Sequence, residues 1–443
     1  MSFPKDTGGW QPESASPALC FHRVVKRSGG APLKLLLILG ALSMFGPLSL
    51  DMYLPALPDL AHSFRTPEAN VQLTLTACMI GLAVGQLVAG PMSDAWGRKK
   101  PLAVGLVAYA ATSLFCALAP DVYSLTAARL LQGLAGAAGL VISRAIVRDL
   151  YDGDALTKFF STLMLVNGLA PILAPVLGGQ LTRFMSWRGV FVVLTVIGAV
   201  LLLAATLGLK ETLPASARGA SRGGLLATLR TFRVLMRDRR FMGYILTGGF
   251  AFAAMFAYIS GSPFVLENIH GLSKQEFSFA FGANALGIMI AGQASGRLVG
   301  RVAPARLLGV GLVMCFGGSA ILLAATAFFH GDLAGTLAGL FLMVSSIGVI
   351  SPQATALALS GYEPAVAGAA SALIGTGQFL FGAVFAPLTG LGSKSSGMPM
   401  ALVIFGLSAA AVVMRLVLVR TPAAVVEGGE AGGGEAVAEP AVA

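Results

Sequence analysis

The chain has 443 residues, of which 56% are hydrophobic and only 11% are charged, and its mean hydropathy is +0.80. An ordinary soluble domain carries about 25% charged residues, so this composition excludes a soluble enzyme, a DNA-binding protein and a secreted disulfide scaffold. The formal net charge of +10 reflects the excess of Lys and Arg in the inner loops of membrane proteins, and we expect no nucleic-acid partner.

Continuous apolar runs, taken in chain order, predict twelve transmembrane helices, each of about 20 residues. Residues 1–32 are polar and are expected to form a disordered cytoplasmic tail, as is the Ala/Gly/Glu-rich segment 421–443. A basic cytoplasmic linker at 210–240 divides the runs into an N-terminal six-helix bundle (33–209) and a C-terminal one (241–420). The runs lie at residues 33–57, 70–92, 101–119, 122–145, 158–182, 188–209, 241–266, 276–298, 306–329, 333–359, 364–392 and 398–419.

The two halves share small residues near the end of their second run, at an offset of 202: Gly85 and Gly287, Ala89 and Ala291, Gly90 and Gly292, Ser93 and Ser295. This repeat supports two pseudo-symmetric bundles.

With the N-terminus inside, the outer loops hold five of the 30 Lys and Arg residues, and 24 lie on the inner side. Both termini are therefore predicted to be cytoplasmic.

Two charged residues lie well inside predicted spans of the first half, away from the span ends. Asp51 is ~27 Å along the first span, and Arg129 is ~12 Å into the fourth. An acid near the interface and an Arg that snorkels to it are the simpler interpretations. The functional interpretation is a protonatable acid in a wet cavity and a buried coupling base. Gln132 follows Arg129 by about one turn, and Gly133, Gly136 and Gly139 form a smooth face for close helix packing.

Two further motifs indicate function. The loop GPMSDAWGRKK at 90–100 combines turn glycines with an acid and three bases. We expect Asp94 to accept hydrogen bonds from the amides of a helix N-terminus, while Arg98, Lys99 and Lys100 anchor the cytoplasmic face. Gly90, Asp94, Gly97, Arg98 and Lys99 are thus candidates for a gating loop. In the fifth run, Gly168, Pro171, Pro175, Gly178 and Gly179 predict a bend with close helix contact.

These motifs resemble those of the major facilitator superfamily. The 90–100 loop is similar to its cytoplasmic signature, RLLQGLAGAAG to the fourth-helix motif of proton-coupled members, and GLAPILAPVLGG to the fifth-helix motif of drug/proton antiporters. LSLDMYLPALP, RDLY at 148–151 and SGSPFVLENIHGLS at 260–273 resemble the Bcr/CflA group, which includes bicyclomycin and chloramphenicol resistance proteins. Ala95 stands where a basic residue is usual, and Gly296 where the second-half loop would carry its acid.

The resemblance implies an all-α major facilitator fold whose halves rock about a central site, in a bacterial inner membrane. It implies proton-driven export of a lipophilic drug, with Asp51 as the first-helix acid and Arg129 as the coupling base. We expect a monomer that uses no cofactor besides the proton gradient and is not an enzyme. Candidates for an adaptable drug cavity are Phe45, Met52, Tyr53, Met255, Tyr258, Phe264, Asn284, Gln378 and Phe381.

Two alternatives stay open at this point. A metabolite importer of the same fold would use a more polar cavity, and an integral-membrane enzyme acting on lipid would need a metal cluster or an exposed nucleophile. The four cysteines form no close pair and the four histidines fall in loops or flanks, so the sequence predicts no metal site. No motif in the sequence identifies which drug is carried.

Overall fold

The computed structural model describes residues 33–151, 153–214, 232–329, 331–360, 362, 364–390 and 396–419. Both predicted tails and much of the predicted linker, at 215–231, lie outside these described residues. Contacts between residues divide the described chain into two units. The first takes in 33–64 and 77–214, and the second takes in 65–76 together with the residues from 232 onwards.

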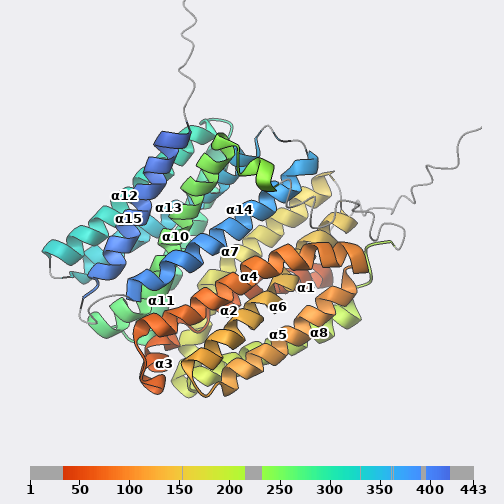
Figure 1. The fold of residues 1–443 in the computed structure, drawn as a ribbon, viewed down its shortest axis with the longest axis horizontal. Helices are drawn as coiled ribbons and strands as arrows, with labels where there is room; N and C mark the ends of the chain where they lie inside the picture. The colour runs from red at the N-terminus through yellow and green to blue at the C-terminus, as the bar shows by residue number, and fades with distance from the viewer. Residues whose placement is uncertain are drawn as a thin grey trace, which may run out of the picture. The chain divides into compact units, whose positions relative to one another are not determined.

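The first unit is built from α-helices joined by short turns. In it α5 packs against both α6 and α8, and α1 packs against α6, α7 and α8 (Figure 1). Its elements are α1 (Leu33–Ser43), α2 (Phe45–Asp51), the 3-10 turn η1 (Leu54–Ala56), α3 (Leu57–Phe64), α4 (Glu68–Trp96, of which residues 68–76 group with the second unit), α5 (Lys99–Leu118), α6 (Val122–Leu150), α7 (Gly153–Phe184) and α8 (Trp187–Gly208).

The first predicted span is not the single straight helix that its apolar run suggests. α1 ends at Ser43 and α2 at Asp51, and the axis bends by 42° at the break between α1 and the helices that follow. Pro47 has no backbone N–H, so the carbonyl of Ser43 cannot receive the usual helical hydrogen bond. Pro55 then lies in the 3-10 turn η1. The run keeps its apolar character while its backbone is broken, which hydropathy alone does not reveal.

In the second unit α13 packs against α11 and α12, and α10 packs against α13, α14 and α15. The neighbouring helices α12 and α15 are visible side by side in Figure 1. Its elements are α10 (Arg239–Pro263), the π-helical turn η3 (Phe264–Ile269), α11 (Lys274–Leu298), α12 (Pro304–Phe328), α13 (Leu333–Leu359), α14 (Pro364–Phe385), the 3-10 turn η4 (Ala386–Gly390) and α15 (Met398–Leu418).

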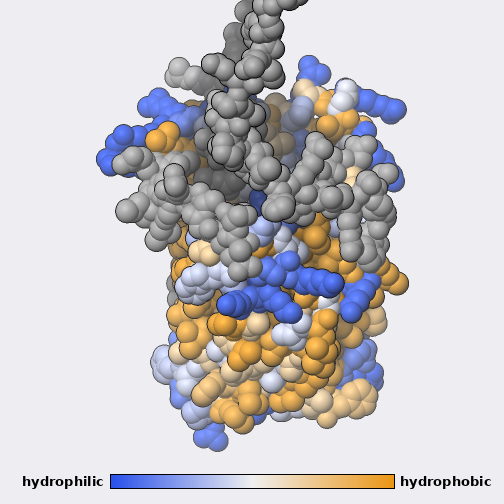
Figure 2. Space-filling model, turned by 90° about the vertical axis from the view of Figure 1, so that its right-hand side faces the viewer, coloured by the Kyte–Doolittle hydropathy of each residue, from blue (hydrophilic) through white to orange (hydrophobic). Residues whose placement is uncertain are grey.

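The predicted all-helical membrane fold is confirmed. Ten described helices are long and apolar enough to cross a bilayer, or eleven if the bent first pair counts as one span. α7, with 32 residues, lies outside that count and occupies the fifth predicted run. Exposed apolar residues form a stripe along α8: Val192, Val196, Val200, Leu203 and Leu207. Figure 2 likewise shows broad hydrophobic areas between hydrophilic patches. Such a surface suits contact with lipid chains.

Both units pack their small-residue helices in the same way. A Cβ on Gly85 of α4 would overlap α6 at Leu134, and a Cβ on Gly287 of α11 would overlap Ser345 of α13. The sequence repeat therefore coincides with equivalent close packing, α4 on α6 and α11 on α13, because only residues without bulky side chains allow the helices to approach so closely.

Candidate functional site

Arg129 is positioned by the glycine face of α6. A Cβ on Gly133 would overlap the carbonyl oxygen of Cys78 on α4, and one on Gly136 would lie 3.3 Å from the ring of Tyr109 on α5. These close approaches gather side chains from several helices of the first unit around the Arg129 side chain.

The guanidinium of Arg129 is fully buried, with 0% of the residue exposed. Its Nη1 donates a 2.5 Å hydrogen bond to Oε1 of Gln132. Its centre lies 4.4 Å from the ring centroid of Tyr53 and 5.6 Å from that of Phe191. Aromatic faces attract a cation through their quadrupole, most strongly where water is excluded. Arg129 is therefore held inside the unit and does not snorkel to the interface.

The amide of Gln132 is itself oriented by α5. Its Nε2 donates to Oγ of Ser113 over 2.7 Å, and the Ser113 hydroxyl donates to the carbonyl of Tyr109 over 2.7 Å. Sequence reasoning does not identify Ser113 or Phe191, because nothing local marks them and only helix packing brings them to α6.

Asp51 is the last residue of α2 and is 5% exposed. Among the described residues, no hydrogen bond or ion pair reaches its carboxyl group. Tyr53, two residues later, contacts Arg129 instead. The two predicted coupling residues thus belong to one unit and are both buried, but they are not joined in this structure. Their roles in coupling stay predictions.

The loop between α4 and α5 is organised around Arg98, which is 6% exposed. Its Nε and Nη2 donate to Oδ2 and Oδ1 of Asp149, over 2.8 and 3.3 Å. Its Nη1 donates to Oγ of Ser93 over 2.8 Å and also to Asp94. Burial by itself would lower the pKa of Arg98, but the hydrogen bonds to Asp149 and Asp94 outweigh it and raise that pKa. The fork on Asp149 is the strong bidentate arrangement.

The expected helix-capping role of Asp94 is wrong, because its carboxylate binds the Arg98 side chain. Glu211, just beyond α8, accepts hydrogen bonds from the backbone N–H groups of Arg98 and Lys99, over 2.9 and 3.2 Å. Gly97 occupies the turn with φ of +89°, a conformation that disfavours any residue with a Cβ. Glu211 and its partners are more than 110 residues apart in sequence, so no local signal predicts the pairing.

α7 continues as a helix through Pro171 and Pro175. A Cβ on Gly178 would overlap the carbonyl oxygen of Met52, directly after α2. Close helix contact is thus present at Gly178, one of the five residues predicted for this helix. The other four are also on α7: Gly168, Pro171, Pro175 and Gly179.

The cavity candidates of the first unit are packed inside it. The ring of Phe45 lies 4.3 Å from that of Tyr109, between centroids. Met52 is 1% exposed and Tyr53 is 0% exposed. In this structure Tyr53 packs against Arg129, whereas Phe45 packs against Tyr109 and Met52 lies against Gly178 of α7.

In the second unit, Asn284 of α11 donates from Nδ2 to the hydroxyl of Tyr258 on α10 over 2.9 Å. Tyr258 stacks on Phe281 with 5.4 Å between ring centroids. Met255, one turn from Tyr258 on α10, is half-buried. The structure therefore joins two of the predicted candidates into one buried polar pair.

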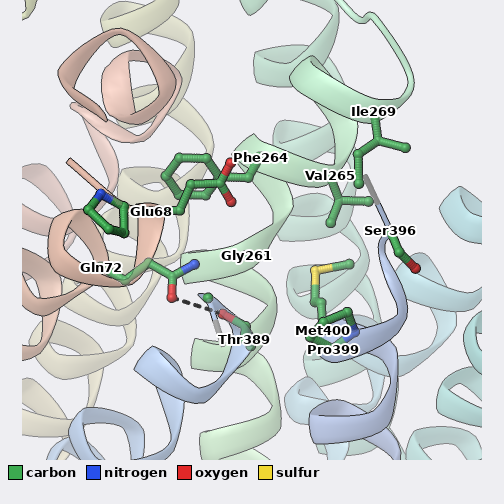
Figure 3. Close-up of a pocket in the computed structure, with 12 residues that line it drawn as sticks. Glu68, Gln72, Gly261, Phe264, Val265, Ile269, Thr389, Ser396, Pro399 and Met400 are labelled. Carbon is green, nitrogen blue, oxygen red and sulfur yellow. Dashed lines mark hydrogen bonds between the residues drawn. The ribbon is translucent and has the colours of Figure 1, made fainter. Parts of the chain in front are cut away.

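Phe264 lines a pocket of the second unit in which apolar side chains lie beside a few polar ones (Figure 3). Gln72, from the part of α4 that groups with this unit, accepts a hydrogen bond from Thr389 Oγ1 over 3.3 Å and donates to the carbonyl of Ser260 over 3.4 Å. The other labelled side chains around it are Glu68, Val265, Ile269, Ser396, Pro399 and Met400.

Gln378 lies on α14 and lines a further small pocket with residues of α10 and α13. Phe381, one turn on, meets Phe250 edge-on with 5.0 Å between centroids. Of the candidates in the second half, Phe264 and Gln378 thus line two different pockets of that unit.

The repeat of the loop motif in the second unit has different hydrogen-bond partners from the loop at 90–100. Ser295 accepts a 2.9 Å hydrogen bond from Nε2 of Gln353, a neutral amide on α13, whereas its counterpart Ser93 accepts from the Arg98 guanidinium. The charged network accordingly belongs to the first unit.

No group of three or more metal-binding side chains occurs among the residues that the structure describes.

Comparison with known proteins agrees with this architecture. The family model of the Major Facilitator Superfamily matches residues 38–387. The "Uncharacterized MFS-type transporter YdgK" of Bacillus subtilis (strain 168) is 43% identical over 85% of this chain and 93% of its own length. The "Bicyclomycin resistance protein homolog" of Haemophilus influenzae is 34% identical, over 82% of this chain and 91% of its own length.

Among solved structures, a D-xylose-proton symporter superposes with a TM-score of 0.70 at 16% sequence identity, covering 86% of this chain and 96% of its own. This likeness concerns the fold alone. The helical architecture, the family match and the two relatives lead to one conclusion: the chain belongs to the major facilitator superfamily and is a multi-pass membrane transporter, not an enzyme.

Proposed function

We propose that this transporter exports lipophilic drugs in exchange for protons, by alternating access. Family membership and the relative named as a bicyclomycin resistance protein homolog support a drug as cargo. The observation that carries the proton coupling is the pair of buried charged residues in the first unit, a fully buried Arg129 and a 5% exposed Asp51 without a partner.

The two residues have different tasks in this proposal. Arg keeps its proton in proteins, so Arg129 supplies a constant positive charge that Gln132 and two aromatic rings stabilise. Asp51 binds and releases the transported proton. A carboxylate buried without a partner is costly, so loading or losing the proton changes the relative free energy of the transporter's states.

The distribution of positive charge supports an orientation with both termini in the cytoplasm of a bacterium. Under that assignment 24 Lys and Arg residues lie on the inner side and five on the outer side, as the positive-inside rule requires. The proton gradient across the inner membrane is then the energy source.

The test is drug transport in proteoliposomes with an imposed pH step. Asp51→Asn should still bind drug but lose pH-driven transport, because an amide cannot carry the proton. Asp59→Asn, which changes another acid of the same unit on α3, is the matched control and should transport like the parent protein. Undiminished pH-driven transport by the Asp51 variant would place the coupling elsewhere, and drug movement in the same direction as the proton would make the protein an importer.

A further inference from the structure

The segment that follows α8 contacts the 90–100 loop at both its backbone and its side chains. Each carboxylate oxygen of Glu211 accepts one hydrogen bond from the start of α5, from the N–H of Arg98 and of Lys99. Oε1 of Glu211 also accepts from the N–H groups of Thr212 and Leu213, over 3.1 and 3.0 Å. One exposed carboxylate therefore ties its own turn to the N-terminus of α5, where the helix dipole favours negative charge.

Thr212 makes the second contact. Its hydroxyl donates to Oδ2 of Asp149 over 2.9 Å. The same oxygen accepts from Nε of Arg98 over 2.8 Å. Thr212 thus restricts the rotation of the carboxylate that binds the Arg98 guanidinium, and it acts on Arg98 through Asp149.

We propose that Glu211 and Thr212 are positioning residues for Arg98, and that the segment after α8 forms a clasp which holds the 90–100 loop in its ion-paired form. The clasp consists of Glu211 and Thr212. Glu211 fixes the backbone of Arg98, and Thr212 fixes the orientation of its main ion-pair partner, Asp149. The role of this clasp in transport rests on the proposed drug export, whereas its effect on Arg98 does not.

Glu211 and Thr212 lie outside the 90–100 loop motif, and in the clasp they act on a residue of that motif. Arg98 pairs with acids at the ends of two different helices, α4 and α6, and the bidentate fork on Asp149 tolerates little rotation. Without Thr212, the Asp149 carboxylate loses one of the donors that set its plane. Without Glu211, the first turn of α5 loses the acceptor for two backbone N–H groups.

Hydrogen exchange tests the clasp without any knowledge of the substrate. In the full-length protein in lipid nanodiscs, Glu211→Gln and Glu211→Ala should speed exchange of the Arg98 and Lys99 amides by roughly tenfold, the effect of losing one charge-assisted hydrogen bond. Lys210→Gln changes a neighbouring exposed residue of the same segment and should leave exchange unchanged. Unaltered exchange in both Glu211 variants would overturn the proposal.

A double-mutant cycle tests the indirect action of Thr212 on Arg98. Thr212→Val should lower the turnover number several-fold with little change in KM, and Thr212→Ser, which keeps the hydroxyl, should restore it. In an Arg98→Ala background the Val substitution should have no further effect on turnover or on the thermal unfolding midpoint.

Thr206→Val is the matched control, because the Thr206 hydroxyl donates only to carbonyls of its own helix. An equal effect of Thr212→Val with and without Arg98 would show that Thr212 acts on its own and would overturn its positioning role. If no drug is transported at all, the export proposal fails, while the exchange and unfolding measurements still decide the clasp.

Discussion

Replacing Arg129 by Lys keeps the charge and removes the geometry that the structure provides for it. The guanidinium donates one 2.5 Å hydrogen bond to Gln132 and lies over two aromatic rings, 4.4 and 5.6 Å from their centroids. A hydrogen bond from a charged donor contributes about 1.5–3 kcal/mol, and a desolvated cation–π contact about 1–2 kcal/mol. A flexible ammonium can keep one of these contacts, so we expect a loss of about 2 kcal/mol.

A loss of about 2 kcal/mol corresponds to roughly a thirtyfold change in a rate or an equilibrium constant. Proton-driven efflux by Arg129→Lys should therefore fall by at least tenfold in proteoliposomes with an imposed pH step, at equal protein content. Arg188→Lys is the control, because Arg188 also lies over an aromatic ring, 4.2 Å from the centroid of Trp187, but at the start of α8. Full efflux by Arg129→Lys, and by Arg129→Ala as well, would refute the reasoning and reduce Arg129 to a packing residue.

Three further outcomes are expected. Asp94→Asn and Gly97→Val should reduce efflux, measured as transport per unit of membrane protein, without abolishing expression. Asp94→Asn weakens the charge-assisted hydrogen bond to Arg98. Gly97→Val forces a β-branched residue to φ of +89°. The hydroxyl of Tyr362 lowers the pKa of Asp238, so this carboxylate stabilises the fold above its unfolded pKa of about 3.9 and loses that contribution as pH falls through its lower folded pKa. The unfolding midpoint of Tyr362→Phe should thus lie below that of the parent at pH 6, and the gap should close in acid; a gap independent of pH would contradict this. A cysteine at position 222 should resist an impermeant reagent added to intact cells, and labelling there would overturn the proposed orientation.

Much of the helical framework follows from local sequence. Apart from the broken first run, each predicted apolar run coincides with a helix among the residues that the structure describes, because a stretch of about 20 apolar residues satisfies its backbone in lipid as a helix. Helix starts are local too. Asp121, directly before α6, accepts from the N–H groups of Tyr123 and Ser124. The glycine face beside Arg129 is likewise readable from sequence, since small residues at helical spacing indicate close packing.

Tertiary structure alone decided which side chains meet. Asp51 and Arg129 are both predictable as buried charges, yet packing brings Tyr53 and Phe191 to the guanidinium and leaves Asp51 apart. Glu211, not Asp94, reaches the amides at the start of α5, across 113 residues for Arg98. Hydropathy and spacing report only on neighbours along one helix. Contacts between helices depend on how those helices rotate and approach one another, which is set by packing across the whole unit.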